Sequence, residues 1–264
     1  MSCYNFEDYT FTDGLLDVNA TYVLHLIGNG RYDSTLKSLK EYHISNKVHI
    51  LMNQGYQKCN KPTIDNPPLD LIGCFLTVFK HAKENGYETI LVLEDDFIFD
   101  EKIKQQYHRN NVNTFLKNHT EAMIYYLGTI PHVSIPYTFT TYRCISSTGT
   151  HAVIYNKQHI DKILNDKRDK KDWDFYHNTS GFCRYMYYTP LCYQLFANTD
   201  NSRYWGYQNP FYFWTAKFFK QFLRLLKLDK QIQPGYNFYY TFSKLWILLL
   251  FLLLFNTRRF WRTR

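Results

Sequence analysis

The sequence lacks a Cys-x-x-Cys pair, an internal repeat, and a basic segment followed by an apolar one at its N-terminus. Six cysteines without that spacing argue against a zinc knuckle or a thioredoxin-type redox site. The first residues, MSCYNFEDYTFTDG, do not have the pattern of a secretory signal peptide. We therefore expect a cytosolic domain whose thiols are reduced.

Charge is scarce in most of the chain. Charged residues make up 20% of the sequence and hydrophobic residues 45%, which excludes a disordered protein and favours a globular one. The net charge is +8, but from Lys217 onward ten basic residues accompany a single acid, Asp229. The chain before Lys217 holds 21 basic and 22 acidic residues, so we do not expect a nucleic-acid partner.

Strand-like and helix-like segments alternate between residues 20 and 165. TYVLHLIG (21–28) and KVHILM (47–52) are typical of buried strands. The spacing of apolar residues in 70–86 predicts a helix, with Asp70 as a possible N-cap and a glycine at its end. The stretch ETILVLEDDFIF (88–99) is typical of a strand buried on both faces of a sheet. This alternation predicts an α/β fold with a mostly parallel central sheet.

The second half of the domain continues less clearly. A helix is predicted over 102–118 and a strand over 122–128, and 141–164 has the pattern strand, turn, strand and helix. Residues 172–206 fit a helix followed by a strand. We place a domain boundary after residue 206, with a separate C-terminal tail at 207–264.

Three consecutive carboxylates interrupt the apolar stretch ILVLEDDFIF (90–99). Neighbouring carboxylates repel one another unless a cation offsets their charge, and the ends of strands in α/β sheets are where ligands bind. On an extended chain Glu94 and Asp96 point the same way and could hold a metal or a ribose, whereas Asp95 points to the opposite side. Asp95 could then serve the loop or a neighbouring basic residue.

Four segments resemble blocks of glycosyltransferase family 25, the lipopolysaccharide-type and collagen-type galactosyltransferases. IGCFLTVFKHAKENGYETILVLEDDFIF is similar to the central helix and EDD strand of that family, and TYVLHLIGNGRYDSTLKSL to its first strand and helix. SSTGTHAVIYNKQHIDKIL and DWDFYH…YYTPLCYQ are similar to its later blocks. The resemblance covers roughly residues 20–197 and implies a GT-A-like nucleotide-sugar-binding domain.

The resemblance implies a metal-assisted transfer of a hexose, galactose or glucose, from a UDP-sugar to a glycan, lipid-linked or protein acceptor. Mn²⁺ or Mg²⁺ would then be the cofactor, because such a metal stabilises the charge of the leaving pyrophosphate. Asp96, Asp95 and His151 are the implied metal ligands. Glu94 and Arg31 would contact the nucleotide. Asp174, with Asp172 second, is the candidate for the base that activates the acceptor.

One difference from the family is the pair Thr77-Val78, where relatives have Ser-His. It leaves open an alternative, a catalytically degenerate transferase fold that acts as a membrane-bound binding or scaffold protein. A third hypothesis is another metal-dependent phosphoryl enzyme that uses paired carboxylates.

The tail predicts association with membrane lipid. In residues 211–230 the basic residues Lys217, Lys220, Arg224 and Lys227 share one helix face, while aromatic residues and leucines line the other, as in interfacial helices. An apolar run of 11 residues, 245–255, follows. With 238–243 added, it reaches about 18 residues, the lower limit for one transmembrane segment. We expect a membrane-associated protein whose catalytic domain is cytosolic, with spanning left open.

Overall fold

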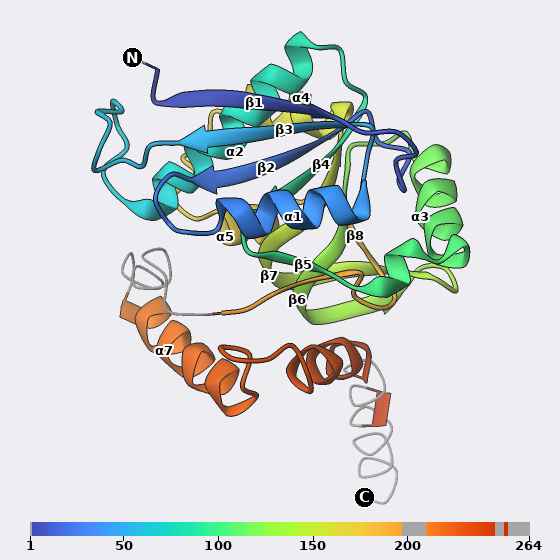
Figure 1. The fold of residues 1–264 in the computed structure, drawn as a ribbon. Helices are drawn as coiled ribbons and strands as arrows, with labels where there is room; N and C mark the ends of the chain where they lie inside the picture. Colours follow the sequence, from blue (N-terminus) through green and yellow to red (C-terminus); the bar gives the residue numbers. More distant parts are fainter. Residues whose placement is uncertain (1, 197–209, 246–250, 253–264) are drawn as a thin grey trace, which may run out of the picture.

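The computed structural model describes residues 2–196, 210–245 and 251–252, which form an α/β fold (Figure 1). Its elements are β1 (Tyr4–Thr10), β2 (Ala20–Leu26), α1 (Tyr32–Tyr42), β3 (Lys47–Asn53), α2 (Pro67–Glu84), β4 (Thr89–Glu94), β5 (Phe97–Phe99), the 3-10 helix η1 (Glu101–Lys104), α3 (Gln106–Asn118), β6 (Met123–Pro136), β7 (Thr141–Asn156), α4 (Lys157–Asn165), α5 (Trp173–Thr179), β8 (Cys183–Tyr187), β9 (Cys192–Gln194) and α7 (Pro210–Leu225). A further helix at residues 235–245 follows α7.

The central sheet has seven strands in the order β1-β3-β2-β4-β7-β6-β8. Strands β3, β2 and β4 are mutually parallel, and β6 and β8 run in the same direction because both are related to β4 through the antiparallel β7. Only β1 and β7 run the other way. The predicted mostly parallel sheet is therefore confirmed, as a mixed sheet. Strands β5 and β9 pair separately beside it.

Helices cover both faces of the sheet, as the continuous apolar strands predict. Along β4, Ile90 and Val92 belong to the hydrophobic cluster that includes α2, α4 and α5, whereas Leu91 and Leu93 belong to the cluster with α1 and α3. Figure 1 shows α1 in front of the sheet. The alternation along β4 decides on which side of the sheet the carboxylates that follow it can lie.

Helix α2 begins earlier than the sequence indicated. Asn66 is its N-cap, with its side chain accepting a hydrogen bond from Leu69 N at 3.0 Å, and Pro67 occupies the first turn. The prediction of Asp70 as the cap is wrong. Asp70 is buried one turn later, where it pairs with the buried Lys61 and accepts a hydrogen bond from Asn53 at 3.0 Å. The helix ends where predicted, with Gly86 in the left-handed conformation beyond Glu84.

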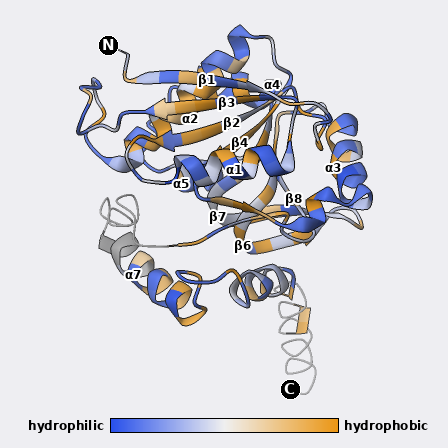
Figure 2. Ribbon diagram, in the orientation of Figure 1, coloured by the Kyte–Doolittle hydropathy of each residue, from blue (hydrophilic) through white to orange (hydrophobic). Residues whose placement is uncertain are grey.

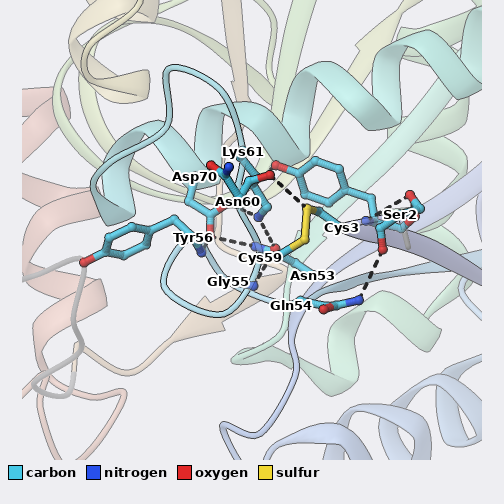
Figure 3. The surroundings of a disulfide bond; sticks show 11 residues. Ser2, Cys3, Asn53, Gln54, Gly55, Tyr56, Cys59, Asn60, Lys61 and Asp70 are labelled. Atoms are coloured by element: carbon cyan, nitrogen blue, oxygen red, sulfur yellow. Dashed lines mark hydrogen bonds and ion pairs between the residues drawn. A yellow bond between two sulfur atoms is a disulfide. The ribbon is translucent and has the colours of Figure 1, made fainter.

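A disulfide joins Cys3, just before β1, to Cys59 in the loop after β3, with their Cα atoms 5.7 Å apart (Figure 3). The expectation that all thiols are free is wrong for this pair, because β1 was not recognised as a strand. Its antiparallel pairing with β3 brings the N-terminus beside the loop. Cys74, Cys144, Cys183 and Cys192 are free.

The segment predicted as strand, turn and strand over 141–156 is one long strand, β7, paired with an equally extended β6. Irregularities in the pairing bend this hairpin, and Gly149 lies within β7 at a φ of 84°. The helix and strand expected after residue 172 are α5 and β8.

The C-terminal segment packs as part of the same body. Leu223 and Leu228 share a hydrophobic cluster with sheet residues, as do Tyr236, Tyr239 and Tyr240 of the 235–245 helix. The predicted boundary after residue 206 lies in 197–209, outside the described residues. Among the residues that the structure describes, no helix has the length and apolar character needed to cross a bilayer. The apolar run 245–255 falls mostly on residues beyond that description.

Residues 238–243, which extend the apolar run to about 18 residues, lie in a helix that packs on the domain. Tyr239, Tyr240 and Ser243 are buried against the domain, and Ser243 shares a hydrogen bond with Ser134 of β6 at 3.1 Å. These side chains therefore contact protein on the inner side of their helix.

The disulfide generates the first testable prediction. Under oxidising conditions, the double variant Cys3→Ser/Cys59→Ser should lose about 2–4 kcal/mol of unfolding free energy, because the unfolded chain gains the freedom of a long open loop. Urea unfolding measures the change. With a reducing agent present, the variant and the wild type should be equally stable. Cys183→Ser, at a free thiol, is the matched control. A loss of the same size with the bonds reduced would contradict the prediction.

Candidate active site

The three carboxylates after β4 separate to different partners. Residues 95–96 form a turn between β4 and β5, so the chain reverses just after the sheet edge. Asp95 lies toward α1, while Glu94 and Asp96 lie toward β7, β9 and α5, where they interact electrostatically with each other. The strand alternation predicts the opposite directions of Glu94 and Asp95, whereas the turn sets the direction of Asp96, and Arg31 contacts both Asp95 and Asp96.

Asp95 ties the end of β4 to the loop between β2 and α1. Its carboxylate lies 2.9 Å from His25 Nδ1 and 2.8 Å from Arg31 Nη1, and it accepts hydrogen bonds from the Asn29 side chain at 2.5 Å and Leu26 N at 3.1 Å. Burial alone would raise the pKa of Asp95, but these partners lower it below its usual range. The charged carboxylate is therefore a stable structural anchor, and both of its oxygens are occupied.

Asp96 is held from the opposite side. The Gln194 side-chain amide lies 2.8 and 2.9 Å from its two oxygens, and Arg31 Nη1 lies 3.2 Å from Oδ2. Burial raises the pKa of Asp96 despite the opposing effects of Gln194 and Arg31. For Arg31, burial lowers the pKa, but Asp96 and Asp95 outweigh it and the net shift is upward. Arg31 keeps a third of its side chain exposed.

Glu94 has little compensation for its charge. Thr150 of β7 donates a hydrogen bond to its Oε1 at 3.0 Å. Burial, followed by repulsion from Asp96 and Asp174, raises the pKa of Glu94 to about 8. Three carboxylates from β4, the following turn and α5 thus face one region, with too few protein cations near them. Such an arrangement favours the binding of a cation or of a ligand that carries one.

Helix α5 brings Asp174 to this region and gives Asp172 a different role. Asp174 accepts a hydrogen bond from Gly149 N of β7 at 2.9 Å, and burial together with Asp172 raises its pKa to about 7. Asp172 is the N-cap of α5, accepting from Phe175 N at 2.8 Å. Of the two predicted base candidates, the structure therefore brings Asp174 to the carboxylates.

His151 follows Thr150, the hydrogen-bond partner of Glu94, in β7. It is fully buried, and burial lowers its pKa to about 3, so the ring is neutral. Its Nε2 lies 3.4 Å from the Tyr236 hydroxyl, and its Nδ1 is buried without a hydrogen-bond partner beside Gly149. A neutral imidazole with a free ring nitrogen has the chemistry of a metal ligand. The metal role itself stays a prediction.

Within the described part of the chain, no three His, Cys, Asp or Glu side chains are grouped closely enough to hold a metal ion on their own. The donors present suit a different type of site. Mg²⁺ and similar hard cations are commonly held by one or two carboxylates together with substrate phosphates. Glu94 and Asp96 fit this type, in which the metal binds with a phosphate-bearing ligand.

Two residues of the site were missed from the sequence. Tyr236, far along the chain, accepts a hydrogen bond from Gln194 N at 2.9 Å and donates one to Gln194 O at 3.1 Å. It thereby fixes the residue that holds Asp96. Gln194 is the last residue of the segment YYTPLCYQ, which resembles the family, but the resemblance implies no role for it. Tyr236 gave no local signal, because its contact depends on how the C-terminal helix folds back.

No protein-family model matches the chain, and no curated protein matches it either. Several solved structures are similar to it. A glycosyltransferase involved in glycosylation of the major capsid of PBCV-1 is 13% identical over 70% of this chain and 95% of its own, with a TM-score of 0.41. A197 from STIV is 10% identical over 63% and 80%, with a TM-score of 0.40. Mannose-1-phosphate geranyltransferase from Thermus thermophilus is 11% identical over 64% and 72%, with a TM-score of 0.37. None of these likenesses assigns a family or an activity.

The contrast between Glu94 and Asp95 generates a pair of predictions with opposite signs. At neutral pH Glu94→Gln should raise the unfolding free energy by about 1–3 kcal/mol, because the native state must protonate Glu94 at a cost, whereas a glutamine is already neutral. Asp95→Asn should lower it by about 3 kcal/mol or more, because it leaves buried donors and Arg31 without their anion.

The pH dependence follows the same reasoning. The native state holds the Glu94 proton up to a pH of about 8, whereas an unperturbed glutamate loses it near 4.5, so this group's contribution to stability falls as pH rises between these values. Glu94→Gln should remove that fall. Urea titrations over this range, with a chelator present, measure both effects. Equal destabilisation by the two variants would contradict the contrast.

A third prediction concerns Tyr236. Tyr236→Phe should cost about 1–3 kcal/mol of stability, because it leaves the buried Gln194 N without an acceptor. Tyr239→Phe is the matched control on the same helix, since its buried hydroxyl has no hydrogen-bond partner. It should change stability little or increase it. Thermal unfolding compares the two variants, and an equal effect of both would exclude the specific role of the Tyr236 hydroxyl.

Proposed function

We propose that the protein is a glycosyltransferase that moves a hexose from a UDP-sugar to a hydroxyl acceptor. The observation that carries the proposal is the group formed by Glu94, Asp96 and Asp174 at the carboxyl end of β4, beside a partly exposed arginine. Ligands of α/β sheets bind at this edge, and a nucleoside diphosphate bound with a divalent metal would neutralise the carboxylates there. The resemblance of the sequence to glycosyltransferase family 25 supports the same reaction.

In the proposed complex Glu94 and Asp96 would hold Mn²⁺ or Mg²⁺ with the help of the diphosphate, and His151 is a candidate for a further contact. The bound metal would supply Lewis-acid stabilisation of the leaving diphosphate. Arg31 contacts the nucleotide, and a guanidinium can donate two parallel hydrogen bonds to phosphate oxygens. Asp95 has a positioning role in this proposal, because it holds Arg31 and the β2–α1 loop.

Asp174 is the proposed base that accepts the proton of the acceptor hydroxyl. Its carboxylate is fixed by Gly149 N and lies close enough to Glu94 to affect the charge of that residue. A base must be within hydrogen-bond reach of the proton that it removes, so the acceptor would enter from the side of α5 and β7. The acceptor class, a glycan, a lipid-linked sugar or a protein, follows from the resemblance.

The alternative is a degenerate transferase fold that binds a sugar nucleotide without turning it over. Val78, at the position of the family's histidine, is fully buried in the core, and Thr77 donates its hydroxyl hydrogen bond to Gly73 O at 2.8 Å. Neither side chain can replace an imidazole. Donor binding without release of UDP, over a broad acceptor panel, would favour this alternative.

The transferase proposal predicts that UDP release from a UDP-hexose requires a divalent cation. Asp96→Asn should lower kcat/KM by about 100-fold or more, because a carboxylate of the diphosphate site is lost. Asp174→Asn should lower kcat by about 100-fold or more while binding of UDP is retained, because only proton removal is affected. UDP release at saturating donor and calorimetric titration with UDP separate the two effects.

Asp169→Asn is the matched control, since Asp169 is an exposed carboxylate in the loop before α5. It should leave both measurements unchanged. Full activity in the presence of a chelator, or an active Asp96→Asn variant, would refute the metal assignment. Turnover that is the same for UDP-sugars and for phosphate esters lacking a nucleoside would favour a phosphoryl enzyme.

A further inference from the structure

Helix α7 has two apolar sides. On the inner side Leu223 is buried in the domain core, and Phe219 packs against it. On the outer side Trp214, Phe218 and Leu225 are 66%, 71% and 74% exposed. These three lie on one strip of the helix, because they are four and seven residues apart. A helix that only covers a core would have polar residues there.

The 235–245 helix has the same organisation. Tyr236, Tyr240 and Ser243 are buried against the domain, whereas Phe238, Phe242 and Leu245 are each about 40% exposed on the other side. The two outer strips are continuous. Phe222 of α7 contacts Phe238 edge to face, with ring centroids 5.6 Å apart, and Phe238 stacks on Phe242 at 5.5 Å, so aromatic contacts connect the two helices.

A cavity of about 230 Å³ opens between the two helices and β6. Its lining residues are apolar or aromatic apart from one histidine: Pro131, His132, Phe222, Phe238, Tyr239 and Phe242. Burial lowers the pKa of His132 to about 4, so the one polar side chain of the lining carries no charge at neutral pH. The space suits a hydrocarbon chain better than a polar ligand.

A basic strip runs beside the outer apolar strip of α7. Lys217, Lys220 and Arg224 are spaced so that they share one face, and Lys217 Nζ lies 5.3 Å from the centre of the Trp214 ring. Between Lys217 and the end of the chain the only acid is Asp229. Figure 2 shows that hydrophobic and hydrophilic residues lie side by side on α7. We call these two strips, with the outer strip of the 235–245 helix, the apolar-basic face.

We propose that the apolar-basic face binds the surface of an anionic lipid bilayer. Its exposed Trp, Phe and Leu side chains would enter the headgroup–acyl boundary, while the lysines and arginine remain at the level of the lipid phosphates. Charge complementarity selects this occupant. A second copy of the chain would bring the same basic strip to the interface, and like charges would oppose the contact. Nucleic acid would leave the large apolar strip in water.

Lipid binding by the apolar-basic face does not depend on the proposed transferase activity. It would, however, place the carboxylate site close to the membrane. The 235–245 helix would contact lipid with one side and hold Gln194 with the other, through Tyr236. The membrane surface and the carboxylate site would then share one helix. An acceptor anchored in the membrane would be held near the protein without further contacts.

Vesicle co-sedimentation of the full chain tests the proposal. The wild type should bind vesicles of phosphatidylcholine and phosphatidylglycerol about tenfold or more tightly than vesicles of phosphatidylcholine alone. Lys217→Glu/Arg224→Glu should abolish this preference. Lys37→Glu/Lys40→Glu, the same change in charge at exposed positions of α1, is the matched control and should change binding by less than about twofold.

The apolar part of the face needs its own variant. Phe218→Ser/Leu225→Ser should lower binding to both kinds of vesicle by about tenfold or more, whereas Tyr107→Ser, at a 60% exposed side chain of α3, should not. Circular dichroism confirms that each variant folds. Equal binding by wild type and both face variants would overturn the proposal and assign any lipid binding to another segment. A wild-type dimer that Phe218→Ser/Leu225→Ser dissociates, with no vesicle binding, would overturn it in favour of a second copy.

Discussion

The carboxylate of Asp95 holds the edge of the sheet on which the site is built. It joins the turn after β4 to His25, Asn29 and Arg31 around the end of β2, and it is stable as an anion because each of its oxygens has donors. With the turn fixed in this way, Glu94 is directed to the opposite side, where its charge has few partners. Asp95, whose charge is balanced by several hydrogen-bond donors, thus positions Glu94, whose charge has few such partners. This arrangement is typical of functional sites.

Much of this arrangement could be predicted from the sequence, because it depends on local patterns. The apolar run of β4 predicted a strand buried on both faces, and alternation along it separated Asp95 from Glu94; Asp96 lies in the turn, where alternation does not apply, and shares Arg31 with Asp95. The α2 helix was also predictable, although its cap was not, because Asn66 and Pro67 read as part of a Pro-rich loop. The mistakes concern pairing between distant segments. The strand β1 and its disulfide, and the long β6–β7 hairpin, depend on partners that periodicity does not reveal.

The C-terminal helices were also predicted only in part from the sequence. The composition of the tail predicted a basic amphipathic helix, and α7 carries Lys217, Lys220 and Arg224 on one face, whereas Lys227 lies in the turn after the helix, with a φ of 57°. What the sequence could not indicate is that the apolar residues divide between two sides, one packed on the domain and one exposed. Nor could it indicate that Tyr236 reaches Gln194. Both depend on how the helices fold back onto β6 and β7, so the tail and the site are one structural unit in the described residues.

The central claim is that Glu94 and Asp96 form half of a metal site that a nucleoside diphosphate completes. Electron paramagnetic resonance of Mn²⁺ tests it directly, because free and bound Mn²⁺ differ in signal. The account predicts that the wild-type protein and UDP together remove the free signal far more than either does alone, and that Glu94→Gln/Asp96→Asn loses this effect. The same free Mn²⁺ in the wild type and the double variant, at every concentration of UDP, would contradict it.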